Sequence, residues 1–124
     1  MRSFTMTKNR FYDTYAVLEI LEGNPNYSEY LSCEGVISIF NLAETAFALN
    51  RKKHQNKEKI VQSLADCVVD TTTADLHEAA RIKSLNKQLS MTDAIGYCIS
   101  IRLGIPFVTG DKGFIGMPNV EFVK

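Results

Sequence analysis

The sequence has no excess of charge of either sign, because its 124 residues include 14 Lys and Arg and 14 Asp and Glu. Domains that bind nucleic acid are usually basic, so the overall charge gives no support to such a partner. Any contact with nucleic acid must therefore depend on local groups of charged residues.

Cysteine and long apolar runs are also scarce. Cys33, Cys67 and Cys98 are an odd number, lie far apart, and form neither a Cys-x-x-Cys pair nor a Cys/His spacing typical of a metal site. We interpret them as reduced, mostly buried thiols. No segment approaches the roughly 18 apolar residues of a membrane span, and no signal peptide is recognisable. These absences predict a cytoplasmic protein with no membrane partner.

The remaining composition is that of one soluble globular domain. The chain is 45% hydrophobic and 23% charged, and no linker or low-complexity tract divides it. Its length is sufficient to bury a core of its own. We expect residues 1–8 to be a flexible N-terminal extension, with Met6 as a possible natural start, and residues 9–124 to form the domain.

Strands and helices are expected to alternate along the chain. Strands are predicted at residues 10–13, 35–38, 67–70, 106–109 and 120–123, and helices at 14–22, 27–32, 57–65 and 73–86. Two more helices are expected: one contains Glu44 and is capped by Ser38, and the other begins after the cap Ser90. In the helix at 73–86 the side chains expected to point inward are Leu76, Ala79, Ala80 and Leu85. This alternation indicates an α/β fold with a mostly parallel sheet of about five strands, flanked by helices on both faces.

Acidic residues follow two of the predicted strands. Asp13 closes the first strand and Asp111 lies just beyond the strand at 106–109. Ligands of open α/β sheets bind outside the carboxyl ends of the strands. A third acid, Asp93, lies in the first turn of a largely apolar helix.

Glu44 lies inside a helix that is apolar nearly all round. At about 100° per residue it shares a face with Phe40 and Phe47, while Leu42 and Leu49 point the other way. We therefore expect Glu44 not to be a solvated surface acid.

Each of these acids also has a purely structural explanation. Ser90-x-x-Asp93 fits a capping box, Asp111 fits a turn, and Asp13 could cap the helix that follows it. Glu44 has no such local partner. The occurrence of all four together is harder to explain by structure alone.

Four short motifs follow one another along the chain. They are Asp13-Thr14, Asn41-Leu42-Ala43-Glu44, Leu89-Ser90-x-x-Asp93-Ala94 and Val108-Thr109-Gly110-Asp111-Lys112-x-Phe114. Each is weak alone, but in this order the sequence resembles the PIN-domain ribonucleases. The similarity is greatest to VapC-type toxins and their stand-alone archaeal-style relatives, and it extends over residues 9–123.

The resemblance implies a three-layer PIN-like fold and a metal-dependent endoribonuclease. In such proteins carboxylates hold Mg²⁺ or Mn²⁺, and a metal-bound water attacks phosphorus without a covalent nucleophile. By this resemblance Asp13 and Asp93 are the principal metal ligands, and Glu44 and Asp111 complete the cluster directly or through water. These four are therefore the expected catalytic residues.

Several other side chains could contact an RNA substrate. Thr14, Thr109 and Lys112 are the candidate substrate-binding residues, although both threonines could equally be polar residues at strand ends. Tyr15 stands where the family commonly has a small polar residue, and it could stack on a base. We interpret the basic run at residues 51–59 as a solvated helix end. Alternative phosphate contacts are Arg81, Lys83 and Arg102, and the histidines His54 and His77 are expected at the surface.

The resemblance favours the toxin of a VapBC-type toxin–antitoxin pair, a homodimer with a VapB-type antitoxin as partner. A PIN nuclease of RNA maturation or decay is one alternative, and a non-catalytic PIN-like interaction module is another, against which the four intact acids argue. A phospho-receiver domain is excluded because it needs adjacent acids after the first strand, whereas Tyr12 precedes Asp13.

Overall fold

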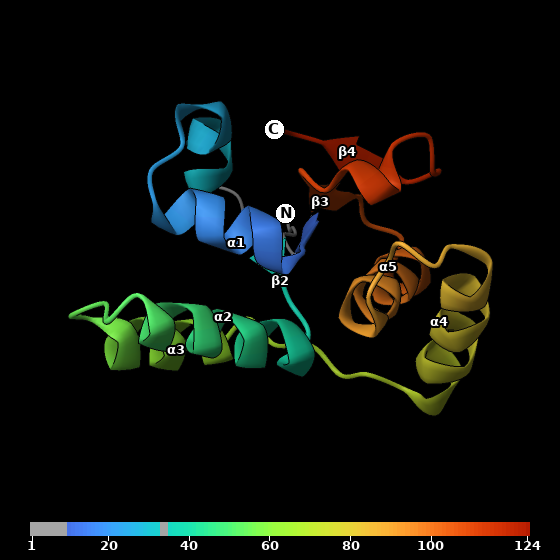
Figure 1. The fold of residues 1–124 in the computed structure, drawn as a ribbon, viewed down its shortest axis with the longest axis horizontal. Helices are drawn as coiled ribbons and strands as arrows, with labels where there is room; N and C mark the ends of the chain where they lie inside the picture. The colour runs from blue at the N-terminus through green and yellow to red at the C-terminus, as the bar shows by residue number, and fades with distance from the viewer. Residues whose placement is uncertain (1–9, 33–34) are drawn as a thin grey trace, which may run out of the picture.

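The computed structural model describes residues 10–32 and 35–124, which form helices around one small sheet (Figure 1). In chain order the elements are β1 (Arg10–Tyr12), α1 (Thr14–Leu21), the 3₁₀ helix η1 (Pro25–Ser32), β2 (Gly35–Val36), α2 (Ile39–Arg51), α3 (Lys57–Ala65), α4 (Thr73–Leu85), α5 (Met91–Leu103), β3 (Phe107–Thr109), the 3₁₀ helix η2 (Lys112–Phe114) and β4 (Val120–Phe122). The predicted extension at 1–8 and Cys33 lie outside the described residues.

The sheet has the order β2-β1-β3-β4, and every pair of neighbouring strands is parallel. The α/β class and the helix-flanked parallel sheet are thus confirmed, with four strands in place of about five. The predicted strand at 67–70 is reduced to a single parallel bridge between Ile37 and Val68. It extends no further because the carbonyl of Asp70 instead accepts a hydrogen bond from Arg102, and the chain turns there into α4.

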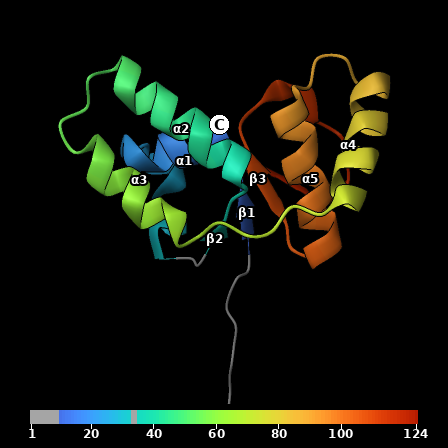
Figure 2. The ribbon, with the colours of Figure 1, turned by 90° about the horizontal axis from the view of Figure 1, so that it is seen from below.

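Helices cover both faces of the sheet. Seen from below, α1, α2 and α3 lie on one side of the strands and α4 and α5 on the other (Figure 2). Because successive side chains of a strand point to opposite faces of the sheet, each strand contributes residues to the cores on both faces. Phe11 and Phe107 belong to the core beside α5, whereas Tyr12 and Val108 belong to the core beside α1.

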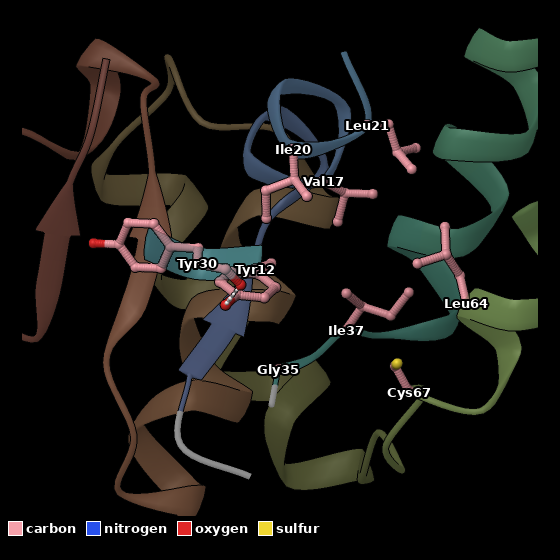
Figure 3. A pocket seen from close by; sticks show the side chains of 9 residues that line it. All are labelled: Tyr12, Val17, Ile20, Leu21, Tyr30, Gly35, Ile37, Leu64 and Cys67. Atoms are coloured by element: carbon pink, nitrogen blue, oxygen red, sulfur yellow. Dashed lines mark hydrogen bonds between the residues drawn. The ribbon is translucent and has the colours of Figure 1, made fainter. Parts of the chain in front are cut away.

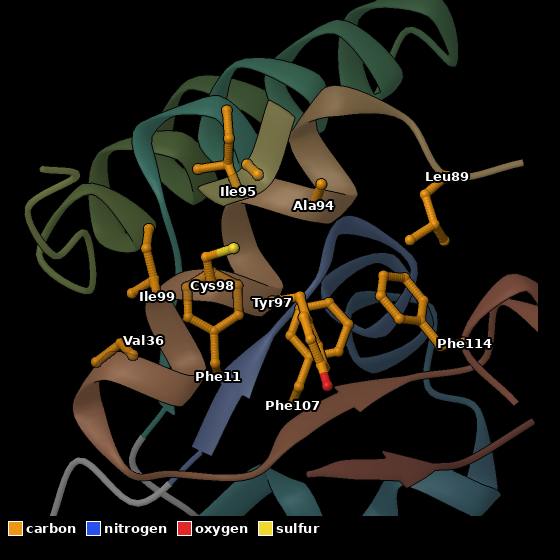
Figure 4. Close-up of a cluster of buried hydrophobic side chains, with 11 residues drawn as sticks. Phe11, Val36, Leu89, Ala94, Ile95, Tyr97, Cys98, Ile99, Phe107 and Phe114 are labelled. Atoms are coloured by element: carbon orange, nitrogen blue, oxygen red, sulfur yellow. The ribbon is translucent and has the colours of Figure 1, made fainter. Parts of the chain in front are cut away.

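The core beside α5 is built around aromatic rings (Figure 4). Phe11 and Phe107 stack with their ring centroids 5.7 Å apart, and Tyr97 of α5 meets Phe107 edge-on at 5.8 Å. At Gly96 an added Cβ would lie 2.7 Å from the Phe11 ring. The glycine therefore lets α5 approach β1 closely, which fixes the helix that presents Asp93.

The packing of α4 differs from the prediction. Ala79 is buried as expected, but Leu76, Ala80 and Leu85 are exposed, with Leu85 71% accessible. The reason is that a polar residue, Asp75, occupies part of the inner face, where it is only 4% exposed. Among the described helices, none has both the length and the apolar character needed to cross a bilayer.

Candidate functional site

The carboxyl ends of β1 and β3 lie next to each other because the two strands are paired in the sheet. Asp13 directly follows β1, and its backbone N–H donates to the carbonyl of Val108 at 3.2 Å. The hydroxyl of Thr109, the last residue of β3, donates to Asp13 Oδ2 and accepts the backbone N–H of Asp111 at 3.0 Å. One buried threonine therefore connects Asp13 and Asp111, which lie 98 positions apart in the sequence.

Asp13 is the most deeply buried of the predicted site acids, with 2% of its surface exposed. It caps α1, and its Oδ1 accepts the Ala16 N–H at 2.8 Å. Burial, together with the negative charges of Asp93 and Asp111, raises its pKa to about 7 against the opposing effect of the hydrogen bonds from Thr109 and Ala16. Asp13 thus shares its surroundings with two acids from distant parts of the chain.

Asp93 occupies the third position of α5 and is half-buried. It forms a capping box in which the Ser90 N–H donates to Asp93 Oδ2 at 3.0 Å and the Asp93 N–H donates to Ser90 Oγ at 3.0 Å. Burial raises its pKa against these bonds, and the charges of Asp111 and Glu44 add to the rise. The capping role and the position near other acids therefore coexist.

Asp111 also has the structural role foreseen for it. It caps η2, and its Oδ1 accepts the Gly113 N–H at 2.9 Å. The preceding Gly110 is buried against the ring of Tyr15, which leaves no room there for a side chain. Lys124 Nζ lies 5.3 Å from the centre of the same ring. Tyr15 thus supports the loop that holds Asp111, and its stacking on a base stays a prediction.

Glu44 is exposed, so the prediction that it is shielded from solvent is wrong. The helix α2 packs through its opposite side, where Leu42 and Leu49 are buried, and leaves Phe40 and Phe47 at the surface with 38% and 64% exposure. Both faces of α2 are apolar, and the sequence pattern does not decide which one faces the core. Glu44 nevertheless reaches the site, because it accepts a hydrogen bond of 2.6 Å from the Thr14 hydroxyl.

None of the four acids is neutralised by Lys or Arg within the part of the chain that the structure describes. The ion pairs there are Arg10–Glu121, Lys52–Glu22, Arg81–Glu78 and Arg102–Asp75. The same residues include no group of three or more His, Cys, Asp or Glu side chains close enough to form a ready-made metal site. The charges of the four acids therefore influence one another, but their side chains are not already arranged as a complete set of metal ligands.

The chemistry of these four acids still fits a hard divalent cation. All four side chains offer carboxylate oxygen, which Mg²⁺ prefers, and Mg²⁺ keeps several of its waters when it binds. Burial and like charge raise the pKa of both Asp13 and Asp93. A bound cation would relieve that crowding. The roles of these acids as metal ligands remain predictions.

Most of the basic residues considered as phosphate contacts are engaged elsewhere. Arg81 pairs with Glu78, Arg102 pairs with Asp75, and Lys83 Nζ donates to the Leu89 carbonyl at 2.9 Å. The side chains of the 51–59 run are largely exposed, and so are His54 and His77. Lys112, the exposed first residue of η2, directly follows Asp111 and is the cation closest in sequence to the acids.

An apolar cavity of about 180 Å³ lies apart from the acids, between α1, β2 and the end of α3 (Figure 3). Its lining includes Val17, Ile20, Leu21, Ile37, Leu64 and Cys67. None of the described residues that line this cavity carries a carboxylate, so these residues offer no ligand of the kind a hard divalent cation prefers.

Asn41 belongs to the motif that contains Glu44, but it was not predicted as a site residue; it is 1% exposed and lies between Ser38 and Thr14. Its Nδ2 donates to Thr14 Oγ1 at 3.1 Å, and its Oδ1 accepts the Ser38 N–H at 2.9 Å. The spacing Ser38-x-x-Asn41 is that of a capping box, and this signal could have drawn attention to the residue.

The family model of the PIN domain matches residues 10–119, which is most of the chain. The chain belongs to the PIN domain family. PIN domains are generally nucleases and generally use divalent metal ions. No curated protein matches this PIN domain significantly by sequence.

Solved structures similar to this PIN domain include three that match nearly the whole of both chains. A toxin–antitoxin complex from Klebsiella pneumoniae is 18% identical with a TM-score of 0.77, and the match covers 91% of this chain and 96% of that chain. FitAcB from Neisseria gonorrhoeae is 17% identical with a TM-score of 0.69, covering 93% and 96%. VapBC2 from Rickettsia felis, bound to a DNA fragment from its promoter, is 20% identical with a TM-score of 0.64, covering 93% and 98%. At these identities the similarity establishes the fold alone.

Proposed function

We propose that this PIN domain is a metal-dependent endoribonuclease and the toxin of a VapBC-type toxin–antitoxin pair. The observation that supports the chemistry is the electrostatic coupling of acids at the carboxyl edge of the sheet. Asp13, Asp93 and Asp111 come from three separate elements, and the charges of the last two raise the pKa of the first. A group of carboxylates that raise one another's pKa and have no paired cation among the described residues is typical of a functional site.

In this proposal Asp13 and Asp93 hold the metal, with Glu44 and Asp111 completing its surroundings directly or through water. A bound Mg²⁺ or Mn²⁺ supplies a more acidic water and stabilises the leaving oxygen. The chain itself orients the acids: α5 presents Asp93 from its first turn, and Thr109 holds one oxygen of Asp13.

The predicted substrate contacts can be refined by counting hydroxyl hydrogens. Thr14 donates its hydrogen to Glu44 and Thr109 donates its hydrogen to Asp13. A hydroxyl has one hydrogen, so in this arrangement both threonines orient carboxylates and offer none to phosphate. Lys112 is exposed beside Asp111, and we assign it the contact with a substrate phosphate.

The decisive experiment is cleavage of a labelled RNA with Mg²⁺ or Mn²⁺, with and without a chelator. We expect cleavage that the chelator stops and that Asp93→Asn removes. Asp66→Asn is the matched control, because Asp66 is an exposed acid at the end of α3. Cleavage that persists in the chelator, or that Asp93→Asn leaves at the control level, contradicts the proposal.

The partner half of the proposal is supported by the toxin–antitoxin complexes among the similar structures. We propose that an Arg side chain of a VapB-type antitoxin binds to the carboxylates of these acids, since a guanidinium can bind carboxylate through two hydrogen bonds. Such a residue competes with the metal for the same oxygens. Inhibition by an Arg-bearing antitoxin peptide should therefore weaken as Mn²⁺ is raised, and inhibition indifferent to Mn²⁺ would contradict this placement.

A homodimer is supported by apolar side chains left at the surface. The most exposed are Ile39 and Phe47 of α2, Leu85 of α4, Ile101 of α5, and Ile115 after η2. Phe40 is also exposed and lies seven positions before Phe47, so the two share one face of α2, and an exposed apolar face of this kind is typical of an interaction surface. Sedimentation at micromolar concentration should show a dimer, and a monomer there would contradict this half of the proposal.

A further inference from the structure

Three capping boxes occur among residues 10–32 and 35–124, and one of them differs from the other two. Thr72-x-x-Asp75 begins α4 and Ser90-x-x-Asp93 begins α5, both with Asp at the third helical position. The helix α2 has Asn41 at the equivalent place after Ser38. An oxygen acceptor is all that a capping box needs from this residue. The amide of Asn41 therefore has a second task.

We infer that Asn41 is a positioning residue of the nuclease site, which orders the Thr14 hydroxyl so that its hydrogen points at Glu44. This inference rests on the nuclease function proposed above. Its basis is a complete account of donors and acceptors along the series Ser38, Asn41, Thr14 and Glu44.

The orientation of the Asn41 amide is fixed by Ser38. The backbone N–H of Ser38 can only donate, and it lies 2.9 Å from Asn41 Oδ1, which also accepts the Ser38 hydroxyl at 2.7 Å. The oxygen of the amide must therefore face Ser38. Its nitrogen then faces Thr14 Oγ1, at 3.1 Å.

The direction of the Thr14 hydroxyl follows from that of the amide. An NH₂ group only donates, so Thr14 Oγ1 must be the acceptor in its bond with Asn41. The single hydrogen of the hydroxyl is then available for Glu44 Oε1, at 2.6 Å. A hydrogen bond to a charged acceptor is stronger than one between neutral groups. Asn41 is 1% exposed, so water does not compete for its amide.

The function of this arrangement is to hold an exposed acid in place. Glu44 lies on the solvent side of α2, where a glutamate side chain would otherwise sample several rotamers. The hydrogen bond from Thr14 holds one of its oxygens, and the charge of Glu44 acts on Asp93. Asn41 thereby acts on the acids through Thr14 without touching them.

The decisive variant is Asn41→Asp, which keeps the capping oxygen but replaces the donor by an acceptor. The Thr14 hydrogen would then turn toward residue 41 and leave Glu44. We expect metal-dependent cleavage per folded molecule to fall about tenfold, the usual scale for a hydrogen bond to a charged group, while the added buried carboxylate also lowers the thermal midpoint. An unchanged cleavage rate in Asn41→Asp would overturn the inference.

A double-mutant cycle separates this effect from that of the added negative charge. In a Thr14→Val background, Asn41→Asp should cause no further loss of cleavage, because the group through which it acts is already gone. If the loss caused by Asn41→Asp is equally large in both backgrounds, Asn41 does not act through Thr14. Thr14→Ser restores the hydroxyl and should restore cleavage.

A second measurement does not depend on cleavage. In the metal-free full-length protein, the NMR signal of the Asn41 side-chain amide should move upfield in Thr14→Val and keep its position in Thr14→Ser. An unmoved signal in Thr14→Val would show that the bond is absent and overturn the inference. If the wild-type protein cleaves no RNA, the nuclease proposal fails, and the amide signal still decides whether Asn41 orders Thr14.

Discussion

Asp13 and Asp75 are two buried acids at the starts of two helices, yet their surroundings are opposite. Asp75, 4% exposed, accepts hydrogen bonds of 3.0–3.2 Å from the guanidinium of Arg102. Burial tends to raise its pKa, but the bonds from Arg102 and Thr72 together lower it below its ordinary value. Asp13, 2% exposed, has no such cation among the described residues, and its pKa rises to about 7.

The difference distinguishes an acid that is paired with a cation inside the fold from an acid at the proposed metal site. A buried carboxylate normally needs a charged partner, because its desolvation is costly. At Asp75 the chain provides that partner, which joins the start of α4 to the end of α5. At Asp13 the nearby charges are those of Asp93 and Asp111, which are of the same sign. The missing cation there is the one that a divalent metal would supply.

The largest expected contrast between the two acids is in catalysis. Asp13→Asn should reduce RNA cleavage on the order of a thousandfold, because it removes a proposed metal ligand. The fold should remain, since an Asn oxygen can still accept the Ala16 N–H. Asp75→Asn should retain cleavage in whatever fraction stays folded. Initial rates normalised to folded protein test this, and equal losses for the two variants would remove the distinction between the two acids.

The second contrast is the pH dependence of stability without metal. The folded-state pKa of Asp13 is about 7 against an ordinary 3.8, so its protonated form favours folding below about pH 4 and this stability is lost as the pH rises through 7. The loss should reach roughly 4 kcal/mol at most. Asp75 has a lowered pKa, so its contribution is present at neutral pH and is lost on acidification.

Urea unfolding between pH 4 and 8 should therefore show a decline in the free energy of unfolding that Asp13→Asn flattens. Asp93→Asn should flatten it in part, because burial also raises the pKa of that acid. A wild-type profile that rises over this range would contradict the assignment.

The third contrast tests the cation that Asp75 has. Arg102→Leu should lower the free energy of unfolding by about 2–3 kcal/mol, because it leaves a buried carboxylate unpaired while Arg102 itself is partly solvated. Adding Asp75→Asn to this variant should recover part of the loss. A change below about 0.5 kcal/mol, the usual size for surface substitutions, would show that the pair adds little.

The smallest contrast is stabilisation by metal. A divalent ion at about ten times its Kd should stabilise the folded protein by about 1.4 kcal/mol. Calorimetry should show an upward shift of the thermal midpoint that Asp13→Asn removes and Asp75→Asn keeps. The same shift in the Asp13→Asn protein would place the metal elsewhere.

The parts of the structure that depend on local rules could be predicted from the sequence. Ser38 and Ser90 cap the helices that follow them, as expected, and α3 spans the predicted residues. The meeting of Asp13 and Asp111 also follows from simple topology, because parallel strands end at the same edge of a sheet. These predictions required only neighbouring residues or the sense of the strands.

The features that could not be predicted are those for which the sequence allows more than one arrangement equally well. The helix α2 has two apolar faces, and only its packing shows that Leu42 is inside and Phe47 outside. The pairing of Asp75 with Arg102 joins residues 27 positions apart that show no local pattern. The direction of the Thr14 hydroxyl depends on Asn41, whose spacing from Ser38 fits capping and does not reveal the contact with Thr14.

The central position of β1 has a consequence for the order in which the protein can assemble during translation. β1 is synthesised before the other three strands, but one of its two neighbours in the sheet is β3, which begins at Phe107. Asp13 obtains its hydrogen bond from Thr109 only after that strand has been made. Pairing between segments so distant in sequence is slow, because a long loop must first close. A nascent chain therefore contains Asp13, Glu44 and Asp93 before it can hold them together, and a ribosome making this protein is not exposed to an assembled acid site until synthesis has passed β3.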